Sequence, residues 1–127
     1  MTASAHCVEV LSAEADPWTS NLLQQLVLDV CGDARVLQVS DGQTALEALC
    51  EHEFAVIISD YQMPNLDGIT YLQFAKQRQP HAIRMMLSAH GDRQSMMQAI
   101  NRAEIYRFLS KPWDDYELEA AIKSAID

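Results

Sequence analysis

Residues 55–59 read AVIIS, and Asp60 follows them directly. The first four residues of this stretch are apolar without a break, whereas a strand with one face in water would alternate apolar and polar residues. An uninterrupted apolar run of this length is typical of a parallel strand that is covered by helices on both faces. The stretch therefore predicts a buried strand of an α/β protein, with an acidic residue at its carboxyl end.

Four similar short runs occur elsewhere in the chain and are also predicted to be strands: Cys7–Leu11, Arg35–Val39, Ile83–Leu87 and Tyr106–Leu109. Segments with apolar residues three and four positions apart alternate with them, which is the spacing of an amphipathic helix. The predicted apolar faces are Leu22, Leu23, Leu26, Val27 and Val30; Ala45, Leu46 and Leu49; Ile69, Leu72 and Ala75; Met96, Ala99, Ile100 and Ala103; and Leu118, Ala121, Ile122, Ala125 and Ile126.

Local signals mark the ends of several of these helices. Asp16 followed by Pro17 predicts an N-cap and a proline in the first turn, because proline has no amide hydrogen to leave unpaired there. Asp114 or Asp115 is predicted to cap the last helix, and Pro80 to close the third. Five strand–helix units with right-handed crossovers predict a doubly wound, five-stranded parallel sheet, a (βα)5 flavodoxin-like α/β fold with helices on both faces. Residues 1–127 are expected to form a single domain.

Composition excludes several classes of function. A chain of 127 residues with 49% hydrophobic residues, four glycines and four prolines is globular. Its net charge of −9 and scattered basic residues argue against direct binding of nucleic acid. No stretch approaches the roughly 20 apolar residues of a membrane span, and the first ten residues do not resemble a signal peptide. A cytoplasmic protein is expected, with Cys7, Cys31 and Cys50 as buried, reduced thiols.

Polar residues follow four of the predicted strands, at the edge where ligands bind in open α/β sheets. The first strand leads into Glu14 and Asp16, the third ends at Asp60, the fourth at Ser88 and the fifth at Lys111. Carboxylates bind a hard cation such as Mg²⁺, while a hydroxyl and an ammonium suit phosphoryl oxygens. Asp60, held at the end of a buried strand, is a candidate carboxylate nucleophile. The set predicts transfer of a phosphoryl group onto an aspartate.

Each of these residues also has a simpler role when it is taken alone. An acid at a strand end is more often a cap or turn residue, and a lysine before a proline can be solvated. For Asp16 and Ser110 the simpler role is preferred, as a helix cap and an ordinary strand-end hydroxyl. What favours a site is the order, since an acid, an aspartate, a serine and a lysine each follow a different strand.

Three segments resemble the receiver domains of two-component response regulators, and the resemblance covers nearly the whole chain. They are ISDYQMPNLDG at residues 58–68, MLSAHGD at 86–92 and FLSKPWDD at 108–115. The resemblance implies that Asp60 is the phosphorylated aspartate and that Ser88 is the hydroxyl that moves onto the phosphoryl group. It further implies that Lys111 binds that group and that Phe108 is the aromatic rotamer switch. Gln62 matches the position whose backbone carbonyl binds the metal and whose side chain tunes phosphoryl lifetime.

The opening acids depart from the family pattern at one position. The family begins with a pair of carboxylates, a further acid and often proline, and residues 14–17 read EADP. Glu14 fits the first acid of the pair, and Ala15 stands where the second is expected to touch the metal. Aligning Asp16 there instead would put Pro17 out of register with the helix start. The resemblance implies a Mg²⁺ site formed by Glu14, Asp60 and the Gln62 carbonyl, with Asp16 as an alternative ligand, and we expect weak affinity.

The first hypothesis is a phosphorelay receiver, a signalling domain and not an independent enzyme, that takes its phosphoryl group from a histidine kinase or phosphotransfer protein. Phosphorylation would change the surface of the fourth helix, fifth strand and fifth helix for an output domain or protein, or for a second copy of the chain. The alternative is a pseudo-receiver that binds partners without phosphorylation, as Ala15 suggests. A flavin carrier of the same fold is disfavoured, because this chain lacks the phosphate-binding loop that such a protein would have after the first strand. An independent hydrolase is disfavoured, because no second aspartate stands two residues after Asp60.

Overall fold

In the computed structural model, which describes residues 8–88, 93–111 and 113–126, strands and helices alternate along the chain. The elements are β1 (Glu9–Ala13), α1 (Pro17–Val30), β2 (Arg35–Val39), α2 (Gly42–Glu51), β3 (Val56–Asp60), β4 (Gln62–Met63), β5 (Leu66–Asp67), α3 (Gly68–Arg78), β6 (Ile83–Ser88), α4 (Arg93–Ala103), β7 (Arg107–Ser110) and α5 (Asp115–Ile126).

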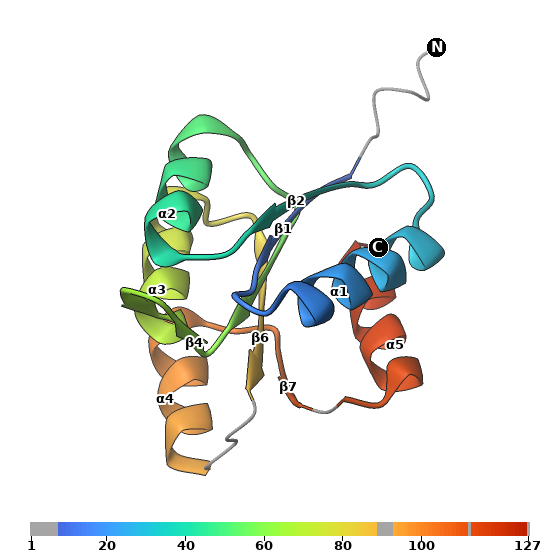
Figure 1. Cartoon of the computed structure of the whole chain (residues 1–127). Helices are drawn as coiled ribbons and strands as arrows, with labels where there is room; N and C mark the ends of the chain where they lie inside the picture. Colours follow the sequence, from blue (N-terminus) through green and yellow to red (C-terminus); the bar gives the residue numbers. More distant parts are fainter. Residues whose placement is uncertain (1–7, 89–92, 112, 127) are drawn as a thin grey trace.

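Five of the strands form one parallel sheet in the order β2-β1-β3-β6-β7. Helices α2, α3 and α4 cover one face of this sheet, and α1 and α5 cover the other (Figure 1). The predicted doubly wound fold is therefore confirmed. The order of the strands reverses between β1 and β3, and ligands in such sheets bind beside this switch point, outside the carboxyl ends of the strands. The ends of β1 and β3 are thus the part of the fold that positions a site.

The apolar run of β3 supplies both cores of the molecule. Ile57 belongs to the core beneath α2, α3 and α4, whereas Val56 and Ile58 belong to the core beneath α1 and α5. All three side chains are almost completely buried. Side chains alternate between the faces of a strand, so a strand with helices on both sides needs consecutive apolar residues. Met85 and Met86 on β6 follow the same rule, one in each core.

Three helices begin in the same way, with an aspartate cap and a threonine three residues later. Asp16, Asp41 and Asp67 each accept a hydrogen bond from the backbone N–H of that threonine, at the starts of α1, α2 and α3. This bond satisfies one of the amide groups that the first turn of a helix leaves unpaired. Pro17 stands in the first turn of α1, as predicted. Asp114 accepts from the amides of the last helix and is its cap.

Several sequence expectations differ from the structure in detail. Leu22 and Ile100 are 42% exposed, because a helix on a single sheet buries a narrower stripe than the full apolar pattern covers. Cys50 is an exposed free thiol, so the expectation of buried cysteines is wrong there, and Cys31 is only partly buried. Cys7 lies outside the described residues, as do the side chains of Met96 and Ala99. None of the helices in the described part of the chain is long and apolar enough to cross a membrane.

The segment after β3 contains a small antiparallel hairpin of β4 and β5 that the sequence pattern did not predict. Asn65 makes its turn with a φ of 72°, which asparagine tolerates better than most residues. The hairpin leads into Gly68, whose amide donates a hydrogen bond to the carbonyl of Tyr61. A side chain at Gly68 would collide with the backbone oxygen of Asp60. The glycine thus allows α3 to start directly against the end of β3.

We predict that Gly68→Ala lowers the free energy of unfolding by about 1–3 kcal/mol, because the added methyl must displace the backbone at Asp60. Urea denaturation monitored by circular dichroism measures the change. Gly32→Ala is the matched control, since an added Cβ there has no neighbour within 4 Å. Gly32→Ala should change stability by less than about 0.5 kcal/mol. Equal effects of the two substitutions would contradict the close approach of α3 to Asp60.

Candidate functional site

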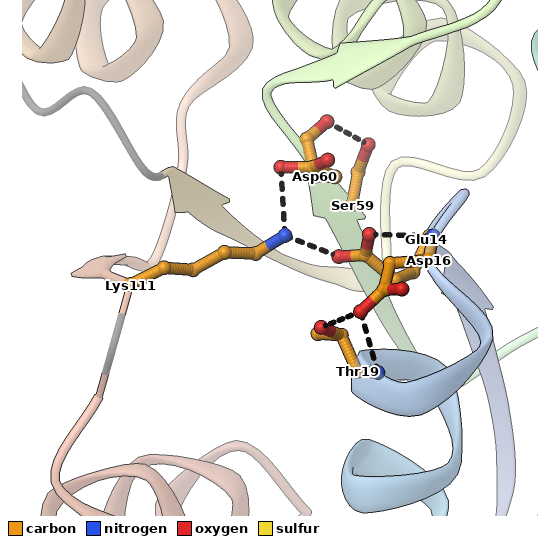
Figure 2. Close-up of polar contacts among 6 residues, drawn as sticks. All are labelled: Glu14, Asp16, Thr19, Ser59, Asp60 and Lys111. Carbon is orange, nitrogen blue, oxygen red and sulfur yellow. Dashed lines mark hydrogen bonds and ion pairs between the residues drawn. The ribbon is translucent and has the colours of Figure 1, made fainter.

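Three charged side chains from three strand ends meet at the carboxyl edge of the sheet (Figure 2). The Nζ atom of Lys111, which follows β7, lies 2.6 Å from Oε1 of Glu14 and 3.3 Å from Oδ1 of Asp60. Glu14 follows β1, and Asp60 is the last residue of β3. The side chains of Glu14, Asp60 and Lys111 are 2%, 15% and 17% exposed, so their charges interact with little screening by water. The predicted convergence of these three residues is confirmed.

Glu14 is fixed in place at both ends. Its backbone amide donates to the carbonyl of Val39 on β2 at 2.9 Å. One carboxylate oxygen accepts from Lys111, and the other accepts from the backbone amide of Asp16 at 3.1 Å. A carboxylate buried this deeply needs such donors, since an unpaired buried charge is costly. The sequence pattern indicated Glu14 as a metal ligand, and it did not indicate that Lys111 would hold it.

Asp16 does not join this group of charges. Its carboxylate faces α1 and accepts from the amide of Thr19 at 3.0 Å and from the hydroxyl of Thr19 at 2.6 Å. These hydrogen bonds hold the pKa of Asp16 below its usual value, because they stabilise the ionised carboxylate. The preferred interpretation of Asp16 as a helix cap is therefore supported. The threonine three residues after the aspartate is the signal that could have identified this partner.

Ser88 and Phe108 lie on neighbouring strands and face the same side of the sheet. Phe108 is partly buried against the core beneath α2, α3 and α4, and its register partner Met86 belongs to that core. Ser88 lies two residues after Met86 on β6 and points to the same face, since side chains two apart share a face. It is 1% exposed. The amide of Lys111 donates to the carbonyl of Ser88, which ties the lysine segment to this strand.

Two further residues border the acidic end of β3. Gln62 begins β4 two residues after Asp60, and its side chain is exposed. The hydroxyl of Ser59, which is completely buried, donates to the backbone carbonyl of Asp60 at 2.9 Å. From its position, Ser59 was expected only to be part of the strand. Its hydrogen bond stabilises the backbone at Asp60, and a serine directly after the apolar run was the available signal.

The oxygen donors at this edge fit a hard divalent cation with few protein ligands. Asp60 contributes a partly exposed carboxylate to this edge. Mg²⁺ is commonly held by only one or two carboxylates together with waters and phosphate oxygens. Ala15 adds no oxygen from its side chain. Among residues 8–88, 93–111 and 113–126, no three His, Cys, Asp or Glu side chains are grouped so that they could hold a metal ion.

A model of the response regulator receiver domain matches residues 10–123 of the chain. The match covers the sheet apart from Glu9 and includes Glu14, Asp60, Ser88 and Lys111, and the chain belongs to this family. It is a receiver domain of phosphorelay signal transduction. Receiver domains are signalling domains that interact with kinases and output domains, and they generally bind Mg²⁺ for phosphorylation.

Individual relatives agree with this assignment. A probable chemotaxis protein CheY from Rhizobium etli is 31% identical over 94% of this chain and 93% of its own length. The receiver domain of an HD domain-containing protein from Pseudomonas fluorescens Pf-5 has a TM-score of 0.87 at 34% identity, covering 94% of both chains. The hydrogenase transcriptional regulatory protein HoxA of Cupriavidus necator is 31% identical over 73% of this chain, which spans only 19% of that regulator.

We predict that Asp16→Ala lowers the melting temperature without changing Mg²⁺ affinity, because Asp16 caps α1 and does not face the group of charges. The lowered pKa of Asp16 means that its contribution is present above the ordinary pKa of 3.8 and is lost as pH falls through the folded-state value. The difference in melting temperature from wild type should therefore shrink as the pH falls below 3.8. Asp16→Asn, which keeps a capping oxygen, is the control. A selective loss of Mg²⁺ binding in both variants would make Asp16 a metal ligand.

Proposed function

We propose that Asp60 is the residue that accepts the phosphoryl group. The observation that carries the proposal is the place of its carboxylate, at the end of the buried strand β3 with an ammonium 3.3 Å away. A carboxylate oxygen of Asp60 forms the new bond to phosphorus while the bond from phosphorus to the donor histidine nitrogen breaks. The histidine leaves with the electron pair of that bond and takes a proton from water.

Lys111 has the role of binding the transferred group. Negative charge is carried by the phosphoryl oxygens throughout the transfer, and an ammonium held beside them offsets it. Lys111 is already held at the accepting carboxylate, so little rearrangement is needed when the donor arrives. Mg²⁺, when bound, would offset part of the same charge. We propose Asp60 and the backbone carbonyl of Gln62 as its protein ligands, with Glu14 close by.

The proposed response to phosphorylation runs through Ser88 and Phe108. The hydroxyl of Ser88 can donate to a phosphoryl oxygen on Asp60, because β6 lies next to β3 in the sheet. Phe108 lies on the same face as Ser88, so its ring can follow the serine inward. Such a local change in packing biases a switch between two arrangements. The exposed side chain of Gln62 is placed to influence how long the phosphoryl group survives.

The proposed partners are a histidine kinase or phosphotransfer protein as the donor, and an output domain or protein as the recipient of the signal. The relative HoxA is a transcriptional regulatory protein that is much longer than this chain. An output domain in the same polypeptide or a separate protein would each suit the surface of α4, β7 and α5, as would a second copy of the chain. We place the exchange in the cytoplasm, with which the free thiols of Cys31 and Cys50 are compatible.

The direct test of this function uses acetyl phosphate and Mg²⁺, with intact mass as the readout. Wild-type protein should gain one phosphoryl group, and Asp60→Asn should gain none because its amide is a poor nucleophile. Asp67→Asn, an exposed acid a few residues away, is the control and should load as wild type does. Labelling of Asp60→Asn to the wild-type extent would overturn the assignment. Absence of labelling in every variant would favour a receiver that acts without phosphorylation.

We predict that Ala15→Asp binds Mg²⁺ about tenfold more tightly than wild type, a difference of about 1.4 kcal/mol. The substitution adds a hard carboxylate at the residue next to Glu14, whose own carboxylate is engaged by Lys111. The fluorescence of Trp18, in the first turn of α1, reports a Mg²⁺ titration. Ala15→Asn supplies a neutral side chain of similar size and should bind much less tightly than Ala15→Asp. Equal affinities of Ala15→Asp and wild type would show that position 15 is not the missing ligand.

A further inference from the structure

We infer that Glu14 is a positioning residue for Lys111 and not a ligand of the metal. The inference rests on the proposed function of Asp60. The carboxylate of Glu14 holds the Lys111 ammonium beside Asp60, so that the cation is in place before a phosphoryl group arrives. The acid that aligns with the first member of the family's metal-binding pair thus has a different partner in this chain.

Each oxygen of the Glu14 carboxylate accepts a hydrogen bond in the structure. Oε1 lies 2.6 Å from the ammonium, and Oε2 accepts from the Asp16 amide at 3.1 Å. The side chain is 2% exposed, which leaves almost no room for water or a hydrated cation against it. Mg²⁺ keeps several of its waters when it binds protein. A cation of this kind would have to displace Lys111 from the shortest ion pair described in the structure.

The two distances from the ammonium differ in a way that suits this role. Lys111 lies closer to Glu14 than to Asp60, by 2.6 Å against 3.3 Å. Glu14 is the more buried of the two acids and accepts two hydrogen bonds, whereas Asp60 is more exposed. The ammonium is therefore anchored on the acid that stays unmodified, and its weaker contact is with the acid that reacts. A group that is held in advance costs less reorganisation during the reaction.

The uncharged side chain of Ala15 limits the negative charge around Lys111. The site contains two carboxylates and one ammonium, so its net charge is −1. A third carboxylate at position 15 would raise the repulsion around Asp60 and compete for the same ammonium. With alanine there, Lys111 can serve both acids without a second cation. The role of Glu14 and the small residue at position 15 are thus parts of the same arrangement.

The test is a double-mutant cycle on the rate of loading by acetyl phosphate at saturating Mg²⁺. Glu14→Gln keeps the shape of the side chain and removes the charge that anchors the ammonium. It should slow loading about tenfold in the wild-type background, and by much less in the Lys111→Met background, where there is no ammonium to position. Glu9→Gln removes the same charge from the other end of β1 and should load as wild type does.

Mg²⁺ titration of the unphosphorylated protein supplies a readout that does not depend on loading. Glu14→Gln should change the Mg²⁺ concentration at half-saturation less in the wild-type background than in the Lys111→Met background. In Lys111→Met the Glu14 carboxylate is no longer held by the ammonium and can reach a cation, so that its removal matters more there. Glu14→Asp, with its carboxylate withdrawn by one methylene, should also load slowly because it no longer reaches Lys111.

Three results would overturn the inference. They are an equal slowing by Glu14→Gln in both backgrounds, a slowing that is seen at low Mg²⁺ and is absent at saturating Mg²⁺, and loading of Glu14→Asp at or above the wild-type rate. Failure of wild-type protein to load at all would instead contradict the proposed function of Asp60. The Mg²⁺ titration would then still decide the role of Glu14, because it uses the unphosphorylated protein.

Discussion

A single ammonium, that of Lys111, joins two carboxylates that the fold would otherwise leave facing each other. Glu14 and Asp60 end neighbouring strands of the sheet, and Glu14 is almost fully buried. Without a cation between them, burial would cost several kcal/mol, since an unpaired buried charge is strongly destabilising. The lysine reaches them from β7, at the far edge of the sheet. The site therefore depends on the sheet being complete, and the end of β7 is coupled to the acid that reacts.

The fold could be predicted from the sequence because its main constraint is local. The consecutive apolar residues of Ala55–Ile58 indicate a strand between two layers of helices, and the structure places Ile57 in one core and Ile58 in the other. The caps at Asp16 and at Asp114 or Asp115 were predicted as well, whereas the caps Asp41 and Asp67 were not. The hairpin of β4 and β5 was not, because four residues carry no hydrophobic period. The exposure of Leu22 likewise depends on how α1 lies against the sheet, and the spacing of the apolar residues in α1 does not specify this.

The sequence predicted which residues meet at the candidate site better than it predicted which contacts they make. Residues after the strands of a parallel sheet share one edge, so the meeting of Glu14, Asp60 and Lys111 followed from their positions. Which acid Lys111 would prefer depends on distances of a few ångströms and on burial, and neither is encoded in spacing. Family resemblance indicated Glu14 as a metal ligand, whereas its carboxylate is engaged by Lys111 and by the Asp16 amide. Assignment of roles within the family therefore has to be checked against the hydrogen bonds of the particular chain.

The arrangement of the site depends most on the bridge made by Lys111, and NMR of ¹⁵N-labelled lysine side chains tests for this bridge. An ammonium that is held by one buried and one partly buried carboxylate exchanges its protons with water slowly, whereas a solvated one exchanges fast. We predict a protected ammonium signal for Lys111 in the unphosphorylated protein, and we predict that this signal weakens in Glu14→Gln. Lys123, an exposed residue of α5, should give no such signal. A Lys111 ammonium that exchanges as fast as that of Lys123 would contradict the bridge and the view of the site built on it.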